Sequence, residues 1–356
     1  MIIKGLTPYY TYSKGTAYLG DSLRLVKLLP DESINLILTS PPFALTSKKE
    51  YGNEDADEYI NWFLKFAVEF KRILKNDGSF VVDLGGSYVP GHPVRNIYQY
   101  ELLIKLVKEL HFFLAQEFFH YNPARLPAPA EWVNVRRIRV KDSVNVVWWL
   151  SKTEYPKANN RNVLRPYTQA MIKLLENGYK AKKRPSGHDI TEKFSRDNKG
   201  AIPPNLLELG NNDSNSFYMR KCQEMEIKPH PAKFPSRFAE FFIKFLTDGD
   251  DVVLDPFAGS NTTGYVAQIL NRRWIAFEIV ESYLEASRFR FEGEGLEEET
   301  VEASRTTGET PRKEVSQLSL FERGEQYGES NERFTFSHRL TPMAVGVESD
   351  GRGLTR

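Results

Sequence analysis

The chain has one cysteine among its 356 residues, Cys222, so no disulfide can form within it. A single thiol and six scattered histidines also argue against a zinc site, and we expect no bound metal. No apolar run approaches the roughly 20 residues that a membrane-spanning helix needs. The N-terminal segment MIIKGLTPYY lacks the apolar core of a signal peptide. These absences predict a protein of the reducing cytoplasm with no membrane partner.

Excess charge of either sign is also missing from the chain as a whole, whose formal net charge is +1. This balance conceals two unequal regions. Residues 120–200 carry 17 Lys and Arg against 7 Asp and Glu, whereas residues 291–356 carry 14 acids against 8 bases. A basic middle with an acidic extension suits a protein that binds a polyanion, although ordinary solvated surfaces would give the same counts.

The first 122 residues alternate between strand and helix patterns. Residues 34–39 and 79–84 are apolar runs typical of buried strands. Between them we expect a helix over about 56–75, ended by Asn76-Asp77-Gly78, and a second helix follows from Tyr98 to Leu110. This order is typical of a parallel sheet that helices cover on both faces. The length allows one large or two modest domains.

The pattern changes at about residue 123, where Pro123 and the segment Leu126-Pro127-Ala128-Pro129 break the chain. The sequence that follows is basic, aromatic and rich in loop residues. A strand is expected over 144–150, and residues 151–227 are expected to be irregular. We therefore place a substrate-specifying region at 123–227.

Regular strand and helix patterns return after residue 227. Ser236 is the expected N-cap of a helix with a phenylalanine-rich face. Strands are expected at 251–255 and 274–277, and helices from about 262 and near 281–291. Beyond residue 290 the Glu-, Ser- and Gly-rich sequence is typical of a disordered tail.

One loop has the composition of a ligand site at a strand end. Asp255 closes an apolar strand, Gly259 lets the backbone approach a ligand closely, and Ser260, Asn261 and Thr262 can donate hydrogen bonds or cap a helix. No lysine stands where a phosphate-binding loop needs one, and the glycine spacing is not that of a dinucleotide site. An acid here favours a ligand with an ammonium group, such as S-adenosylmethionine. A simple tight connection between strand and helix would also account for this loop taken alone.

A second loop, Ser40-Pro41-Pro42-Phe43, follows the strand at 34–39. The two prolines fix φ and remove two backbone donors, so the loop presents acceptors, namely the Ser40 hydroxyl and nearby carbonyls. The lone pair of a conjugated exocyclic amine is delocalised into its ring. Accepting both N–H groups in a non-planar geometry would localise that lone pair for attack on a methyl sulfonium. Phe43 offers a ring on which a base can stack, although a Pro-Pro turn without function is also common.

Together these two loops resemble those of β-class DNA amino-methyltransferases, in which the catalytic motif precedes the cofactor motif. TSPPF is the form typical of cytosine-N4 enzymes, whereas adenine-N6 enzymes usually have Asp or Asn in place of Ser40. The similarity runs from about residue 14 to residue 290 and includes the segments GTAYLGDS, KKEYGN, VVDLGG, PAEWVN, VNVVWWLSKTE, RPSGHDI and IPPNLL. The resemblance implies an α/β fold, the Rossmann-like sheet of a class I S-adenosylmethionine-dependent methyltransferase, with helices on both faces, a circularly permuted motif order and a smaller basic target-recognition region.

The resemblance also implies a division of the chain and a set of site residues. The division is a catalytic half at 1–122, a target-recognition region at 123–227, a cofactor-binding half at 228–290 and an acidic tail at 291–356. In the catalytic set, Asp83 at a neighbouring strand end would assist removal of a proton, although a turn or cap acid is an equal alternative. The implied catalytic residues are Ser40, Pro41, Pro42, Phe43 and Asp83. The implied cofactor-binding residues are Asp21, Pro231, Phe234, Asp255, Phe257, Gly259, Ser260, Asn261, Thr262 and Glu278, with Asp21 at the adenine and Glu278 at the ribose.

Many loops of this family have a second glycine where this chain has Asn261, which leaves the role of that side chain open. The resemblance implies double-stranded DNA as the partner, flipping of the target cytosine, and a palindromic site such as CAGCTG, with a cognate restriction endonuclease as a further partner that need not touch this chain. Phosphate and base contacts are expected from the basic region. The expected DNA-binding residues are Arg136, Arg137, Arg139, Lys141, Lys182, Lys183 and Arg184.

Alternatives remain open at this level. Adenine-N6 methylation uses the same geometry, RNA or a small molecule could replace DNA, and a DNA-binding module without catalysis would keep the basic region. Carbon-5 methylation needs a reactive thiolate, and Cys222 does not follow a proline as that chemistry would suggest. In the tail, Gln317-Leu318-Ser319-Leu320-Phe321 resembles the motif by which bacterial proteins dock onto the replication sliding clamp. Leu320 and Phe321 would fill an apolar cleft and Gln317 would bond at its edge, although the segment could equally pack on its own protein.

Overall fold

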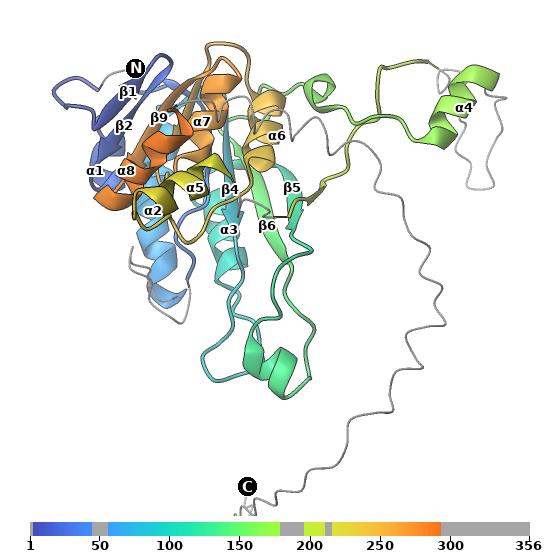
Figure 1. The fold of residues 1–356 in the computed structure, drawn as a ribbon, viewed down its shortest axis with the longest axis horizontal. Helices are drawn as coiled ribbons and strands as arrows, with labels where there is room; N and C mark the ends of the chain where they lie inside the picture. The colour runs from blue at the N-terminus through green and yellow to red at the C-terminus, as the bar shows by residue number, and fades with distance from the viewer. Residues whose placement is uncertain (1–2, 45–55, 179–195, 211–215, 293–356) are drawn as a thin grey trace, which may run out of the picture. The chain divides into compact units, whose positions relative to one another are not determined.

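A nine-stranded sheet with helices on both faces is the centre of the computed structural model, which describes residues 3–44, 56–178, 196–210 and 216–292 (Figure 1). All these residues belong to one compact unit, Met1–Thr307. The strands are β1 (Tyr10–Tyr12), β2 (Gly15–Leu19), β3 (Ile34–Thr39), β4 (Leu74–Leu84), β5 (Phe113–Tyr121), β6 (Val144–Ser151), β7 (Leu206–Glu208), β8 (Val252–Asp255) and β9 (Arg273–Glu278). The α-helices are α1 (Ser22–Val26), α2 (Ala56–Ile73), α3 (Tyr98–Lys108), α4 (Gln169–Asn177), α5 (Phe217–Glu224), α6 (Ser236–Leu246), α7 (Thr262–Ile269) and α8 (Glu281–Ser287). Shorter helical turns are η1 (Glu131–Val135), η2 (Asn160–Val163) and η5 (Arg288–Arg290).

The strand order is β1-β2-β9-β8-β3-β4-β6-β5-β7. Strands β2, β9, β8, β3 and β4 are mutually parallel, whereas β6 runs antiparallel to both β4 and β5. The carboxyl ends of the five parallel strands therefore meet at one edge of the sheet, where open α/β folds bind ligands. Because β5 is antiparallel to β6, its carboxyl end reaches that same edge.

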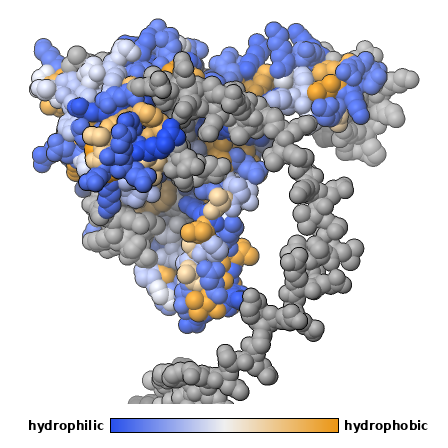
Figure 2. Space-filling model, in the orientation of Figure 1, coloured by the Kyte–Doolittle hydropathy of each residue, from blue (hydrophilic) through white to orange (hydrophobic). Residues whose placement is uncertain are grey.

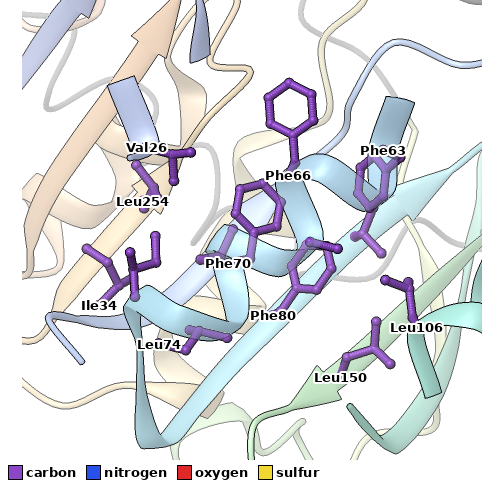
Figure 3. Packing of buried hydrophobic residues seen from close by; sticks show 14 of the residues in the cluster. Val26, Ile34, Phe63, Phe66, Phe70, Leu74, Phe80, Leu106, Leu150 and Leu254 are labelled. Atoms are coloured by element: carbon purple, nitrogen blue, oxygen red, sulfur yellow. The ribbon is translucent and has the colours of Figure 1, made fainter. Parts of the chain in front are cut away.

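Residues along the central strands belong to two separate hydrophobic cores, one on each face of the sheet. In β3, Ile37 belongs to the core under α1, α2 and α3, while Leu36 and Leu38 belong to the core under α6, α7 and α8. Figure 3 shows the first core, in which Phe63 and Phe70 of α2 lie against Phe80 of β4 with ring centroids 6.2 and 5.2 Å away. Burial of each such ring contributes about 1.5–3 kcal/mol, so both faces of the sheet are stabilised mainly by apolar packing.

Two element boundaries differ from those that the sequence predicts. Helix α2 ends at Ile73, and the Asn76-Asp77-Gly78 turn lies within β4, where the pairing with β3 shifts register between Ile34 and Leu36. The polar turn residues therefore form a bulge in the strand and do not end the helix. Ser236 is the first residue of α6 and not its N-cap, a position that Pro235 occupies without a capping side chain.

The expectation of irregular structure over 151–227 is wrong in part. Strand β7 pairs with β5 at one end of the sheet, and α4 and α5 are regular helices whose N-caps are Thr168 and Ser216. The expected strand at 144–150 is confirmed as β6. Within the described ranges, no helix has the length and apolar character needed to span a membrane.

Candidate active site

A cavity of about 760 Å³ opens at the carboxyl edge of the sheet, within the size range of small-molecule sites. The loop predicted to be catalytic, residues 40–43, and the loop predicted to bind the cofactor, residues 255–262, both contribute to its wall. We call them the catalytic loop and the cofactor loop. The ends of β2, β4 and β9 also contribute. The predicted site residues on this wall are Asp21, Ser40, Pro41, Pro42, Phe43, Asp83, Pro231, Phe234, Phe257, Gly259, Ser260, Thr262 and Glu278. Residues separated by more than 200 positions in the sequence thus share one cavity.

Gly259 fixes the shape of the loop after β8. Its φ of +52° lies in the left-handed region that glycine tolerates best, and a Cβ there would lie 3.0 Å from Nε2 of His230. Its backbone N–H donates to Oε2 of Glu278 at 2.8 Å. Burial lowers the pKa of His230 to about 4, so the ring packed against this glycine is neutral at neutral pH.

The carboxylate of Glu278 braces the cofactor loop while still facing the cavity. Besides the Gly259 N–H, it accepts the backbone N–H groups of Ile279 at 3.0 Å and Val280 at 2.8 Å. Burial raises the pKa of this carboxyl group, and the three N–H donors oppose that effect. Each carboxylate oxygen has two lone pairs, so Oε2 retains one for a hydroxyl group of a ligand.

Asp255 lies behind the loop, not on the cavity wall. Its carboxylate accepts the Thr39 hydroxyl at 2.7 Å, the Thr263 hydroxyl at 2.7 Å and the Phe257 N–H at 3.1 Å. The residue is 2% exposed, and burial raises its pKa to about 6. Because Thr39 directly precedes Ser40, this hydrogen bond ties the catalytic loop to the cofactor loop. A contact between Asp255 and an ammonium group stays a prediction.

Asn261 has an internal role that the sequence left open. It adopts the left-handed conformation with φ 51°, and its Oδ1 accepts the Gly264 N–H at 3.1 Å as the N-cap of α7. Its Nδ2 donates to the Tyr10 hydroxyl at 2.9 Å. The side chain is fully buried and Asn261 does not line the cavity, so its polar atoms stabilise the loop from inside the protein.

In the catalytic loop, Ser40 Oγ donates to the main-chain oxygen of Asp83 at 3.3 Å. That bond uses the only hydroxyl hydrogen, which leaves the oxygen lone pairs free to accept. The Phe43 ring lies directly over Gly85, where a Cβ would overlap it. Tyr98 donates its hydroxyl to the carbonyl of Gly85, and Gln99 donates to that of Leu84 at 2.8 Å, so α3 anchors this strand end.

The sequence prediction missed several polar residues on the wall, and His120 is the one closest to the predicted catalytic residues. His120 of β5 lies with its Nδ1 3.3 Å from Oδ2 of Asp83, and both side chains are buried. Nothing in the local pattern marked His120, because β5 itself was not predicted and the contact depends on how β4, β6 and β5 pair. Asn145 and Arg125 are further wall residues of this kind, joined by a hydrogen bond of 3.0 Å.

The predicted DNA-binding residues that the structure describes lie on the loop between β5 and β6. We call residues 123–143, which include η1, the η1 arm. Arg136 pairs with Glu131 at 2.7 Å, Arg139 donates to the carbonyl of Pro93, and Lys141 donates to that of Pro123. Figure 2 shows hydrophobic and hydrophilic residues side by side on the lobe of the molecule that contains this arm. The predicted residues Lys182, Lys183, Arg184, Gln317, Leu318, Leu320 and Phe321 lie outside the described residues.

Comparison with known proteins identifies the class. A family model described as DNA methylase matches residues 34–289, so the chain belongs to this family. The type II methyltransferase M.PvuII of Proteus hauseri is 54% identical over 304 residues, which cover 85% of this chain and 90% of the relative. M.ScaI of Streptomyces caespitosus is 30% identical over 293 residues, covering 81% and 84%. A solved structure titled PvuII DNA methyltransferase (cytosine-N4-specific) matches with a TM-score of 0.68 and 47% identity, covering 86% of this chain and 97% of that chain.

These findings confirm the predicted family and the class I methyltransferase fold. The family uses S-adenosylmethionine as its methyl donor. The cavity suits that molecule because two acids, Asp21 and Glu278, lie on its wall at the ends of neighbouring strands, and because Phe257 and Phe234 supply apolar surface. Phe257 is held by Trp62 and Phe66 of α2, with ring centroids 5.7 and 5.1 Å away.

Proposed function

We propose that the chain is a type II methyltransferase that transfers a methyl group from S-adenosylmethionine to N4 of cytosine in a short site of duplex DNA. The observation that carries this proposal is the set of acceptors at the catalytic loop. Ser40 Oγ directs its hydrogen to the Asp83 carbonyl, two prolines remove backbone donors, and Asp83 has an oxygen without a partner among the described residues. An amino group with two N–H donors matches these acceptors. The likeness to the enzyme titled cytosine-N4-specific supports the same target.

In this proposal the target cytosine leaves the duplex and stacks on Phe43, because a base that is still paired and stacked in DNA cannot present its amino group to a pocket of the enzyme. Ser40 and Asp83 accept the two N–H groups and draw the nitrogen lone pair out of the ring. S-adenosylmethionine supplies the methyl group from its sulfonium. The bond from methyl carbon to sulfur breaks with its electron pair left on sulfur, a nitrogen–carbon bond forms, and one proton leaves the nitrogen.

Methylation of carbon 5 finds no support at Cys222. The thiol is buried at 1% exposure beside Tyr218 and Ala286, and burial raises its pKa. A thiol in that state is a poor nucleophile, and it does not line the cavity. Adenine-N6 methylation stays the second candidate, because the family model covers amino-methylation of both bases.

We also propose partners and a cellular location for this reaction. The η1 arm would contact duplex DNA, since it carries Arg136, Arg137, Arg139 and Lys141, and the enzyme would act in the cytoplasm, where the chromosome and the methyl donor are present. A restriction endonuclease that cuts the same site would complete the system without direct contact. The peptide Gln317–Phe321 would dock onto a sliding clamp, and absence of binding in a titration at high micromolar concentration would exclude that partner.

The test is nucleoside mass spectrometry of unmethylated DNA incubated with the purified chain and S-adenosylmethionine. N4-methylcytosine is the expected product. N6-methyladenine would keep the fold and the chemistry but assign the other base. The absence of any methylated nucleoside, together with retained DNA binding, would favour a binding module without catalysis.

A further inference from the structure

The His120 ring lies between the catalytic strand end and helix α6. Its Nδ1 is 3.3 Å from Oδ2 of Asp83, and its ring centroid is 5.2 Å from that of Phe238 at an interplanar angle of 37°. His120 is 8% exposed and Asp83 is 2% exposed, yet both contribute to the cavity wall. The pair thus lies at the border between the protein interior and the site of the amino group.

Sheet pairing explains why two residues 37 positions apart meet. Asp83 of β4 is opposite Val147 of β6, and His120 of β5 is opposite Asn145, two residues before Val147 on the same strand. Val81 and Phe118, two residues before each, both belong to the core under α6, so Asp83 and His120 point to that same face. Strand β6 spaces them so that the long imidazole reaches the short carboxylate.

The donors and acceptors of the two side chains determine which ring nitrogen of His120 carries the hydrogen. A carboxylate only accepts, so a hydrogen bond between the two requires the hydrogen on Nδ1 of His120. Within the described residues, Oδ1 of Asp83 and Nε2 of His120 are buried atoms without a partner. A buried acceptor without a partner is costly, and because Asp83 lines the cavity, a donor on a bound substrate would satisfy Oδ1.

We propose that His120 is a positioning residue, which holds Oδ2 of Asp83 through its Nδ1–H so that Oδ1 receives a proton of the substrate amino group. This inference rests on the proposed function. As the nitrogen–carbon bond forms and the sulfur keeps the electron pair of the broken bond, the proton passes from nitrogen to Oδ1. Asp83 then carries a neutral carboxylic acid group and releases the proton to water when the product leaves. His120 neither gains nor loses a proton, and Phe238 limits rotation of its ring.

Two substitutions of nearly equal shape separate this role from a packing role. His120→Asn keeps an N–H donor close to the position of Nδ1, whereas His120→Leu removes the donor and keeps a branched side chain of similar size. We expect His120→Leu to lower the single-turnover rate of methyl transfer about 10- to 100-fold, the range that loss of an orienting partner costs in other sites. We expect His120→Asn to keep the rate within a few-fold of that of the wild type. Dissociation constants for S-adenosylmethionine and DNA should change less than about twofold in both.

The measurement is incorporation of labelled methyl groups into unmethylated plasmid DNA at saturating enzyme, with thermal unfolding recorded for each variant. A His120→Leu rate within about threefold of the wild type would overturn the inference. An equal loss in both variants, or a loss confined to DNA affinity, would overturn it as well. Addition of His120→Leu to Asp83→Asn should lower the rate no further, and an additive loss would mean that His120 acts independently of Asp83.

The wild-type enzyme is measured first, which keeps two failures apart. If it forms no methylated nucleoside, the proposed function fails. If it methylates DNA and His120→Leu does so equally fast, only the role of His120 fails.

Discussion

Hydrogen-bonding capacity distinguishes the side chains at the cavity from one another. Asp255 and Asn261 use their polar atoms inside the protein, to join Thr39, Thr263, Tyr10 and the start of α7. Ser40 keeps acceptor capacity on the cavity side. The prediction for Asp255 therefore concerns stability, and the prediction for Ser40 concerns the rate of the reaction.

Ser40→Ala should lower the rate of methyl transfer by about 100-fold or more, because an acceptor aimed at the reacting amino group is lost. DNA binding should stay nearly unchanged, since among the described residues the hydroxyl makes one hydrogen bond, to the Asp83 carbonyl. Single-turnover rates and DNA dissociation constants test this, with Ser33→Ala outside the cavity as the control. A matching loss of DNA affinity would contradict the assigned role.

Asp255 should make stability depend on pH. Burial raises its pKa from the ordinary value of 3.8 to about 6 in the folded chain, so the folded state binds this proton more tightly than the unfolded state does. The stabilisation is complete below pH 3.8 and is lost as the pH rises through about 6. A shift of this size corresponds to about 3 kcal/mol.

Urea unfolding of the wild type and of Asp255→Asn, between pH 4 and pH 7, measures that dependence. The free energy of unfolding of the wild type should fall more steeply over this range than that of the variant. Parallel curves would show that Asp255 ionises normally in the folded chain.

Among the elements, the turn between β8 and α7 is the one most constrained by backbone conformation. Gly259→Ala should destabilise the chain by about 1–2 kcal/mol, the cost of a left-handed L-residue, and should weaken S-adenosylmethionine binding through displacement of His230. Gly249→Ala is the matched control, because Gly249 has no positive φ and its nearest neighbour would be 3.6 Å from the new Cβ. Thermal unfolding and donor titration test both variants, and an equal response would refute the special role of Gly259.

Local pattern was sufficient to predict four of the strands that build the cavity, but not β2, which leads to Asp21. The apolar runs at β3, β4, β8 and β9 and the loops that follow them were predicted, because each strand is buried on both faces and ends in a distinctive turn. Strands β1, β2, β5 and β7 were not predicted. β5 has exposed residues over its first half and β7 has only three residues, so neither shows a clear apolar period.

The contacts that depend on strand order could not be predicted for the same reason. His120 meets Asp83 only because β6 lies between β4 and β5, and Thr39 meets Asp255 only because β3 and β8 are neighbours. Most of the site residues predicted from motifs line one cavity, with Asp255 and Asn261 outside its wall, whereas the contacts made by strand pairing had no signal in the sequence. Their exact roles stay predictions.

At the scale of the whole molecule, the positive charge of the η1 arm should contribute to the affinity for DNA and to its dependence on salt. Arg137→Ala should weaken DNA binding and reduce the slope of log affinity against log salt by about one, since one phosphate contact would be lost. Arg137 is an exposed residue of the η1 arm. Lys27→Ala, an exposed change after α1, should leave the slope unaltered. Equal slopes for the wild type, Arg137→Ala and Lys27→Ala would indicate that DNA binds elsewhere than on the arm.

The way in which the η1 arm joins the sheet has an evolutionary consequence. The arm leaves at the end of β5 and returns at the start of β6, and the two ends are closed by a hydrogen bond of 2.8 Å from the Asn122 N–H to the Ser143 carbonyl. An insertion of this kind can change in length and sequence while the paired strands keep their register. Exchange of arms between relatives that act on different DNA sites would then be a route by which new specificities arise around an unchanged catalytic centre.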